Sequence, residues 1–240
     1  MNNTNYLYYI NIENLSDDDF KKGYCFVSEE RKNKINKYRN IQDKKLSLCS
    51  ELLLRYILND FNIISKFEYY YNDNNKPYLK DLNYYFNISH CKDYVICAFS
   101  KDEIGCDIEK IREIDMNIVK KYFNSNEVSE ILSLKDEKQK ESVFFRYWTL
   151  KESFIKNIGK GLSYPLNEFS INIDKEINII QSYNNDNYYF EEFFINSNYK
   201  CSICKHNNNK TKLIKVNIDD LKTILDNNIE NIWVKGEIYA

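Results

Sequence analysis

The segment from Glu141 to Ile158 constrains the fold more than any other part of this 240-residue chain. Its apolar residues cover much of the circumference of a helix: Phe144, Phe145, Tyr147, Trp148, Leu150, Phe154, Ile155 and Ile158. Such a helix must be buried on most sides, and Gly159 predicts where it ends. The charged residues that it carries, Lys151, Glu152 and Lys156, therefore need partners, because an unpaired charge is costly to bury.

A second segment places two acids, Asp107 and Glu109, two residues apart. On an extended strand such residues point to the same face, and the residues between them turn to the core. On the helix, spacings of four bring Trp148, Glu152 and Lys156 onto one line. Together these side chains predict a site that holds a divalent metal against a phosphate. Taken singly, such motifs are more often surface acids and a surface ion pair.

Composition bounds the class of protein. The chain is 43% hydrophobic and 29% charged, which suits one large or two small folded domains. Its 34 basic and 36 acidic residues argue against a protein that mainly binds the nucleic-acid backbone. We expect no export signal and no membrane anchor, because no apolar run is long enough. Seven scattered cysteines fit a reducing compartment, so we expect a cytoplasmic protein.

The remaining patterns predict a mixture of helices and antiparallel strands. Ser28 is placed to cap the first of two helices that reach residue 59, and an interrupted helix is expected over residues 116–134. Extended segments are expected at 67–71, 84–88, 94–99 and between 169 and 204. The segments that begin at Tyr94 and Tyr199 are similar, which suggests an internal duplication with a ligand site between two lobes.

Three further motifs are open to two interpretations. His90 follows an extended segment and is either a structural histidine or a ligand contact. The basic segment from residue 31 to residue 45 is either a solvated helix face or a phosphate site. Cys201, Cys204 and His206 are not expected to bind zinc, because strand positions three apart face opposite ways.

Three motifs in register resemble those of the Sfp (surfactin-type) group of 4'-phosphopantetheinyl transferases. They are Phe86 to His90, Gly105 to Glu109, and Trp148 to Lys156. The resemblance implies an α+β fold of two similar, pseudo-symmetric lobes, each a small antiparallel sheet packed with helices, with the active site at the lobe interface. We expect the lobes to span residues 1–103 and 104–240.

The resemblance also implies the activity. The enzyme would transfer 4'-phosphopantetheine from coenzyme A to a serine of an apo acyl or peptidyl carrier protein, as in nonribosomal peptide and polyketide biosynthesis, and release adenosine 3',5'-bisphosphate. Asp107, Glu109 and Glu152 would bind Mg²⁺. The partners implied are coenzyme A and carrier proteins, without nucleic acid or membrane, and two lobes in one chain imply a monomer. A segment with Lys120 and Lys121, residues 116–123, is our candidate for carrier docking.

By the same resemblance, residues from both halves would bind coenzyme A. Lys151 and Lys156 would meet the pantetheine phosphate and the pyrophosphate. Ser89 and His90 would meet the region of the 3'-phosphate, Lys76 and Pro77 the adenine side, and Arg31 and Lys34 the nucleotide. Leu46 stands where family members often carry arginine, so Lys44 or Lys45 is expected to make that phosphate contact. Lys156 would stabilise the leaving oxygen, and Glu152, or less favourably Glu109, would accept the serine proton.

Two other functions fit parts of the sequence. Three acids with nearby lysines would also suit a metal-dependent phosphohydrolase that acts on nucleotides. The basic segment and the 21 tyrosines would suit a non-catalytic module that binds RNA.

Overall fold

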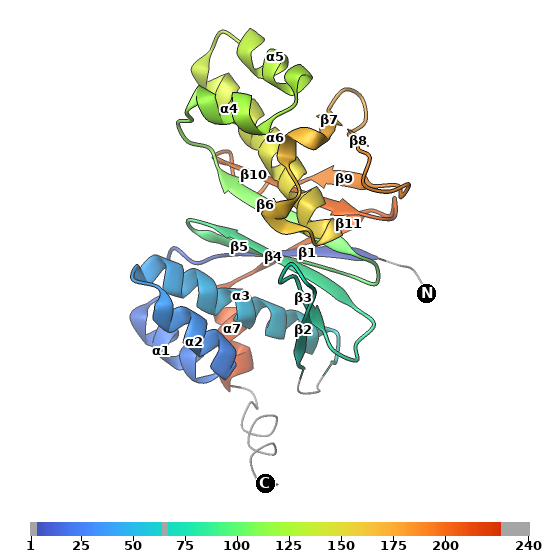
Figure 1. Ribbon diagram of the computed structural model, residues 1–240. Coiled ribbons are helices and arrows are strands. Elements are labelled where there is room, and N and C mark those ends of the chain that lie inside the picture. Colours follow the sequence, from blue (N-terminus) through green and yellow to red (C-terminus); the bar gives the residue numbers. More distant parts are fainter. Residues whose placement is uncertain (1–3, 64–66, 227–240) are drawn as a thin grey trace. The chain divides into compact units, whose positions relative to one another are not determined.

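The computed structural model describes residues 4–63 and 67–226 (Figure 1). The chain forms two compact units that alternate along the sequence. Unit 1 contains Met1–Tyr6, Tyr69–Asn87 and Ala98–Lys212. Unit 2 contains Leu7–Glu68, Ile88–Cys97 and Leu213–Ala240.

Unit 1 is built around helix α6 (Glu137–Ile158), which packs along a three-stranded antiparallel sheet of order β6-β10-β9 (Figure 1). The strands are β6 (Ile104–Lys110), β9 (Tyr189–Glu192) and β10 (Tyr199–Lys205). The other helices and turns are α4 (Met116–Tyr122), α5 (Ser125–Ser133), η1 (Gly161–Ser163) and η2 (Leu166–Glu168). Two antiparallel hairpins complete the unit, β2 (Tyr69–Tyr71) with β3 (Pro77–Leu79) and β7 (Ser170–Asn172) with β8 (Asn178–Ile180).

Unit 2 is centred on α3 (Ile41–Asp60), against which the other helices pack: α1 (Asp17–Cys25), α2 (Glu29–Lys37) and α7 (Ile218–Asp226). A four-stranded sheet has the order β11-β1-β5-β4, and each of its strands has residues in both units. Its strands are β1 (Asn5–Asn11), β4 (Tyr85–Cys91), β5 (Tyr94–Ser100) and β11 (Thr211–Val216). With these sheets and helices, the expected α+β class is confirmed.

The ends of α6 follow from local side chains. Asp136 caps the helix by accepting a hydrogen bond from the main-chain N–H of Gln139, so α6 starts before the Glu141 expected from sequence. Gly159 ends it in the left-handed conformation, at φ 64° and ψ 28°, as predicted. The expected interruption between α4 and α5 falls at Asn124, which caps α5.

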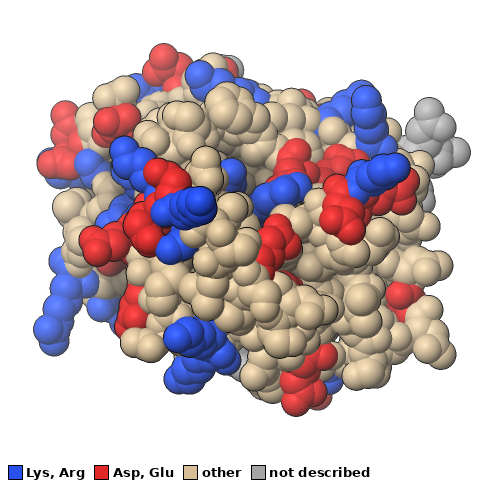
Figure 2. Space-filling view, turned by 90° about the horizontal axis from the view of Figure 1, so that it is seen from above, with Lys and Arg blue, Asp and Glu red and all other residues tan. Residues whose placement is uncertain are grey.

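Acidic and basic side chains are interspersed over the face shown in Figure 2, without a broad area of either sign. This distribution agrees with a formal net charge of −2. In the part of the chain that the structure describes, every helix is too short or too polar to span a bilayer.

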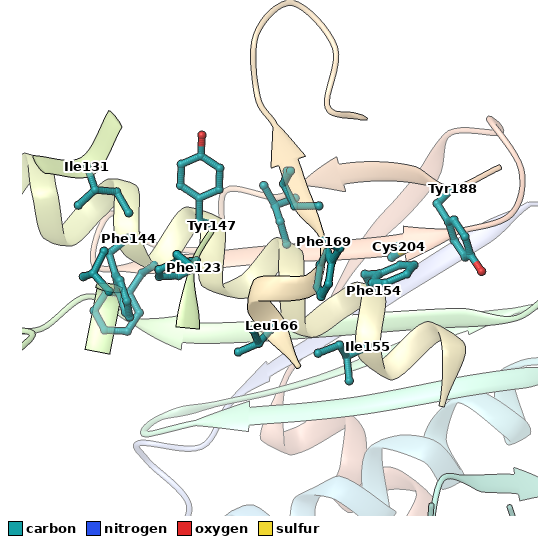
Figure 3. Close-up of a cluster of buried hydrophobic side chains, with 14 residues drawn as sticks. Phe123, Ile131, Phe144, Tyr147, Phe154, Ile155, Leu166, Phe169, Tyr188 and Cys204 are labelled. Atoms are coloured by element: carbon teal, nitrogen blue, oxygen red, sulfur yellow. The ribbon is translucent and has the colours of Figure 1, made fainter. Parts of the chain in front are cut away.

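The core of unit 1 is a cluster of aromatic and aliphatic side chains around α6 (Figure 3). Phe154 points from α6 to Phe169, with ring centroids 4.9 Å apart, and meets Tyr188 edge to face, also at 4.9 Å. Burying each large apolar side chain contributes about 1.5 to 3 kcal/mol. This cluster fixes the body of α6 and confirms that the helix is buried, as its sequence predicts.

Candidate active site

Helix α6 lies very close to β6 at Gly105. A Cβ atom on Gly105 would lie 2.0 Å from the carbonyl oxygen of Ser153 and 2.4 Å from the main-chain nitrogen of Asn157. These are backbone atoms that cannot turn aside, so only glycine fits. Because Asp107 and Glu109 share the strand face of Gly105, the contact brings both acids to α6. Sequence reasoning identified the motif but not this reason for its glycine.

The first of these acids is paired with Lys156. The Lys156 ammonium lies 2.6 Å from Oδ1 of Asp107, whose side chain is only 5% exposed. Burial lowers the pKa of Lys156, but the interactions with Asp107, Cys106 and Glu152 together outweigh burial, and the pKa is raised above its ordinary value. Lys156 is therefore a fixed positive charge at neutral pH.

The helix acid Glu152 faces the same group of charges. Burial raises its pKa to about 7, with further increases from the charges of Asp107 and Glu109, while Lys156 opposes them. A carboxyl group with this pKa exchanges its proton near neutrality. The structure thus brings together four of the residues selected from sequence: Asp107, Glu109, Glu152 and Lys156.

Glu109 has a cationic partner that sequence reasoning missed. Nη1 of Arg112 lies 3.0 Å from Oε2 of Glu109, and the guanidinium stacks 4.8 Å from the Phe145 ring centroid. Within residues 4–63 and 67–226, no three His, Cys, Asp or Glu side chains form a preassembled metal site. Here Lys156 and Arg112 supply positive charge to the two strand acids.

A buried hydroxyl lies beside Asp107. Ser202 of β10 is directly opposite Asp107 in the sheet register, so the two side chains share a face. Its Oγ is buried and has no hydrogen-bond partner among the described residues. A buried hydroxyl left in this way indicates a position for a water molecule or a ligand.

Lys151 is not brought to the acids. Its side chain is 0% exposed, and its ammonium lies 2.9 Å from Glu127, 2.9 Å from the Leu166 carbonyl and 2.6 Å from the Phe169 carbonyl. These three acceptors use all three N–H groups. Burial lowers the pKa of Lys151 to about 8, against the opposing charge of Glu127. The phosphate role expected for Lys151 stays a prediction that this placement does not favour.

We expect Lys151→Met to lower the free energy of unfolding by about 3 to 5 kcal/mol, because it leaves Glu127 as an uncompensated buried charge. Adding Glu127→Gln should recover part of the loss. Urea denaturation measures both. Lys140→Met is the matched control, since its pair with Glu137 on the same helix is partly exposed and should contribute less than about 1 kcal/mol. A Lys151→Met variant as stable as this control would contradict the assignment.

Lys76 is also held inside unit 1. Its ammonium donates to Oε2 of Glu103 at 2.6 Å and to the carbonyl of Asn157 at 2.8 Å, and the residue is 7% exposed. In the turn before it, Asn75 adopts the left-handed conformation at φ 62°. Pro77 begins β3. The nucleotide contacts expected of Lys76 and Pro77 stay predictions.

Two basic residues lie together in unit 2. Nε of Arg31 is 3.4 Å from Oε2 of the buried Glu51, and its Nη1 is 3.4 Å from the Ser47 hydroxyl. Desolvation by its neighbours, and then the charge of Arg31, lower the pKa of Lys34. Arg31 is thus paired with Glu51, and the coenzyme A contacts expected of Arg31 and Lys34 stay predictions.

The remaining selected residues are also in unit 2. The Lys45 ammonium donates to the Leu15 carbonyl at 2.7 Å and pairs with Asp17 at 3.1 Å, which ties α3 to the start of α1. Ser89 is buried and His90 is exposed, both on β4. Their expected coenzyme A contacts stay predictions.

Comparison with known proteins covers both parts of the chain. Residues 103–204 match the family described as "4'-phosphopantetheinyl transferase superfamily", and residues 14–102 match "4'-phosphopantetheinyl transferase, N-terminal". The chain is 32% identical over 195 residues to 4'-phosphopantetheinyl transferase Sfp of Bacillus subtilis, which covers 79% of this chain and 87% of that protein.

Two further relatives extend the similarity. One is 4'-phosphopantetheinyl transferase gsp of Aneurinibacillus migulanus, 38% identical over 74% of this chain and 76% of that protein. The other is the L-aminoadipate-semialdehyde dehydrogenase-phosphopantetheinyl transferase of Mus musculus, 32% identical over 61% of this chain and 53% of that protein. The first family match includes β6, α6 and the charges gathered between them.

Proposed function

Because the chain belongs to the 4'-phosphopantetheinyl transferase superfamily and is an enzyme of that type, we propose that it transfers the 4'-phosphopantetheine group from coenzyme A to a serine of an apo acyl or peptidyl carrier protein, with release of adenosine 3',5'-bisphosphate. The observation that carries this proposal is the cluster of Asp107, Glu109, Glu152 and Lys156 at the close contact of β6 with α6. The relatives are transferases, so a nucleotide phosphohydrolase is not the function supported.

We propose Mg²⁺ as the metal, held by the carboxylates of Asp107, Glu109 and Glu152. Three hard oxygen donors suit this ion, which usually binds a few carboxylates together with substrate phosphates and water. Burial and then the charges of Asp107 and Glu109 raise the pKa of Glu152, so a cation there would be stabilising. The buried Ser202 hydroxyl beside Asp107 fits a water molecule bound to that cation. When bound, the ion supplies positive charge that stabilises phosphate oxygens.

Lys156 and Glu152 have separate roles in this proposal. As charge grows on the leaving phosphate oxygen, the Lys156 ammonium, oriented by Asp107, donates a hydrogen bond to it. Glu152 accepts the proton of the attacking serine, directly or through a water molecule. Glu109 is the alternative base.

Arg31 and Lys34 are our candidates for the nucleotide phosphates, together with Lys45, Ser89, His90, Lys76 and Pro77 as predicted from the family. The lobe boundary at residues 103 and 104, the active site at the lobe interface, the monomeric state and the cytoplasmic location remain proposals from the sequence. The absence of nucleic-acid and membrane partners is likewise a proposal from the sequence.

We propose α4 as the surface that docks the carrier protein. Ile118 is 39% exposed and Tyr122 is 37% exposed on this helix, and Lys120 and Lys121 are exposed beside them. An apolar surface edged by lysines is complementary to an acidic helical domain.

The direct test is to incubate the protein with Mg²⁺, coenzyme A and a panel of apo carrier domains, and to follow the carriers by mass spectrometry. We expect one carrier serine to gain the phosphopantetheine mass, with equimolar adenosine 3',5'-bisphosphate. Chelation of the metal should stop the reaction, and Asp107→Asn should slow it by about 100-fold or more. Glu113→Gln, which removes an exposed charge from the loop after β6, is the matched control. Coenzyme A cleavage without a carrier would contradict the proposal.

A further inference from the structure

The last turn of α6 is tied to its surroundings by one buried side chain, that of Asn157, which is 1% exposed. Its Nδ2 donates to the Glu103 carbonyl at 3.1 Å and to the Cys204 carbonyl at 3.0 Å. Its Oδ1 lies 2.9 Å from Nε2 of His206. Because the two carbonyls can only accept, the amide orientation is fixed, and Nε2 of His206 must carry the hydrogen.

The main chain of Asn157 is held as firmly as its side chain. Its carbonyl accepts a hydrogen bond from the buried Lys76 ammonium at 2.8 Å. Its nitrogen is one of the atoms that a Cβ on Gly105 would strike. One residue of α6 therefore meets β6, β10 and the β2–β3 hairpin.

Asn157 lies close along α6 to two side chains of the candidate site. Lys156, whose ammonium pairs with Asp107, is the preceding residue, and Glu152 lies little more than one turn before. The last turn of a helix lacks intrahelical partners for its carbonyls and frays unless it is held. The aromatic cluster around Phe154 secures the body of α6, whereas the ties at Asn157 secure its end.

We propose that Asn157 is a positioning residue for phosphopantetheinyl transfer: it sets the last turn of α6 on the β6–β10 sheet and so holds Lys156 and Glu152 against Asp107 and Glu109. This inference rests on the proposed function. It assigns to Asn157 no contact with substrate or metal. Its effect passes through the placement of the two neighbouring side chains.

Asn157→Asp is the sharpest test, because it keeps the size of the side chain and the acceptor for His206 but turns an oxygen to the Glu103 and Cys204 carbonyls. A displacement of about 1 Å costs up to about 100-fold in rate, and we expect a kcat loss of that order. The KM for the carrier protein should stay within about twofold, since α4 is untouched. Thr149→Ala is the matched control, because this buried hydroxyl bonds only the Arg146 carbonyl within α6.

Calorimetric titration with Mg²⁺, in the presence of coenzyme A and without carrier, separates positioning from a structural role. Loss of folded protein lowers the number of ions bound per chain and leaves Kd unchanged. Loss of positioning leaves that number unchanged and raises Kd, by about 10-fold on the scale of residues that orient metal ligands. A folded Asn157→Asp variant with wild-type kcat and wild-type Kd would overturn the inference.

His206 provides a second series should Asn157→Asp not fold. His206→Ala removes one hydrogen bond from Oδ1 and leaves both carbonyls satisfied, so we expect a smaller fall in kcat. His206→Gln offers a replacement donor and should restore most of the rate. Equal rates for all three proteins would overturn the inference. Failure of the wild-type enzyme to label any carrier would instead reject the proposed function, and the Mg²⁺ titration would still report on positioning.

Discussion

Gly105→Ala should abolish phosphopantetheinyl transfer and lower the free energy of unfolding by about 3 kcal/mol or more, because overpacking against backbone atoms cannot be relieved by a rotamer change. The added Cβ would lie 2.0 Å from the Ser153 carbonyl oxygen. To accommodate it, α6 must move away from β6, which separates Glu152 and Lys156 from the strand acids. Urea denaturation and the carrier-labelling assay measure the two effects.

Gly23→Ala is the matched control for this substitution. Gly23 lies in α1, and a Cβ there would meet only the ends of two leucine side chains, the nearest being Cδ1 of Leu52 at 3.0 Å. Leucine side chains can shift, and alanine favours a helix, so stability should change by less than about 1 kcal/mol. Wild-type activity in Gly105→Ala would show that the close contact does not set the site.

Glu152→Gln should reduce transfer by about 100-fold or more, since it removes both the proton acceptor and a proposed metal ligand. It should also stabilise the folded protein at alkaline pH. Burial, followed by the charges of Asp107 and Glu109, raises the pKa of Glu152 to about 7. An acid whose pKa is higher in the folded than in the unfolded state binds more protons when folded, so it costs stability as pH rises.

The pH window lies between the ordinary glutamate pKa of 4.5 and the pKa of about 7 in the folded protein. The cost of Glu152 is nearly absent below the ordinary glutamate pKa, grows between about pH 4.5 and 7, and is complete above pH 7. We therefore expect the advantage of Glu152→Gln over the wild type in free energy of unfolding to grow by on the order of 2 kcal/mol from pH 5 to pH 8. Denaturation curves at both pH values test this. An equal stability difference at the two pH values would show that Glu152 is not a buried acid repelled by its neighbours.

The local elements of the fold were predictable because their signals are short in range. Ser28 caps α2, Gly159 ends α6, and Asp107 and Glu109 lie on the strand β6, as expected from the sequence. The first strand and the C-terminal helix α7 were not predicted. The division into lobes at residues 103 and 104 remains a prediction. Each of the two compact units is assembled from three separate segments of the chain, and no local sequence pattern encodes such an arrangement.

The candidate site was predictable in its charges but not in its supports. The spacing of Asp107 and Glu109, and of Glu152 and Lys156, follows from strand and helix periods, so sequence alone placed them on common faces. Whether a buried lysine faces a ligand or the core depends on packing between distant segments. Lys151 therefore looked like a phosphate contact in sequence, although its ammonium bonds Glu127 and two carbonyls.

The role of Asn157 also depends on contacts between distant segments, and sequence reasoning missed it. Nothing in its neighbourhood along the chain distinguishes it, and its importance arises only when α6 reaches Glu103, Cys204 and His206. Gly105 carries a partial signal that sequence reasoning did not use, since an isolated glycine within a strand often marks the close approach of another backbone. Which backbone approaches is information that only the assembled structure contains.

Our proposal is that the contact of β6 with α6 lets Asp107, Glu109 and Glu152 hold one divalent ion against the diphosphate of coenzyme A. Its most direct test is a crystal structure with coenzyme A and Mn²⁺ in place of Mg²⁺, in which the anomalous scattering of manganese locates the ion. We predict a single strong peak bonded to carboxylate oxygens of these three residues and to the diphosphate. A peak coordinated by other side chains, or coenzyme A bound with its diphosphate away from Asp107, would contradict it.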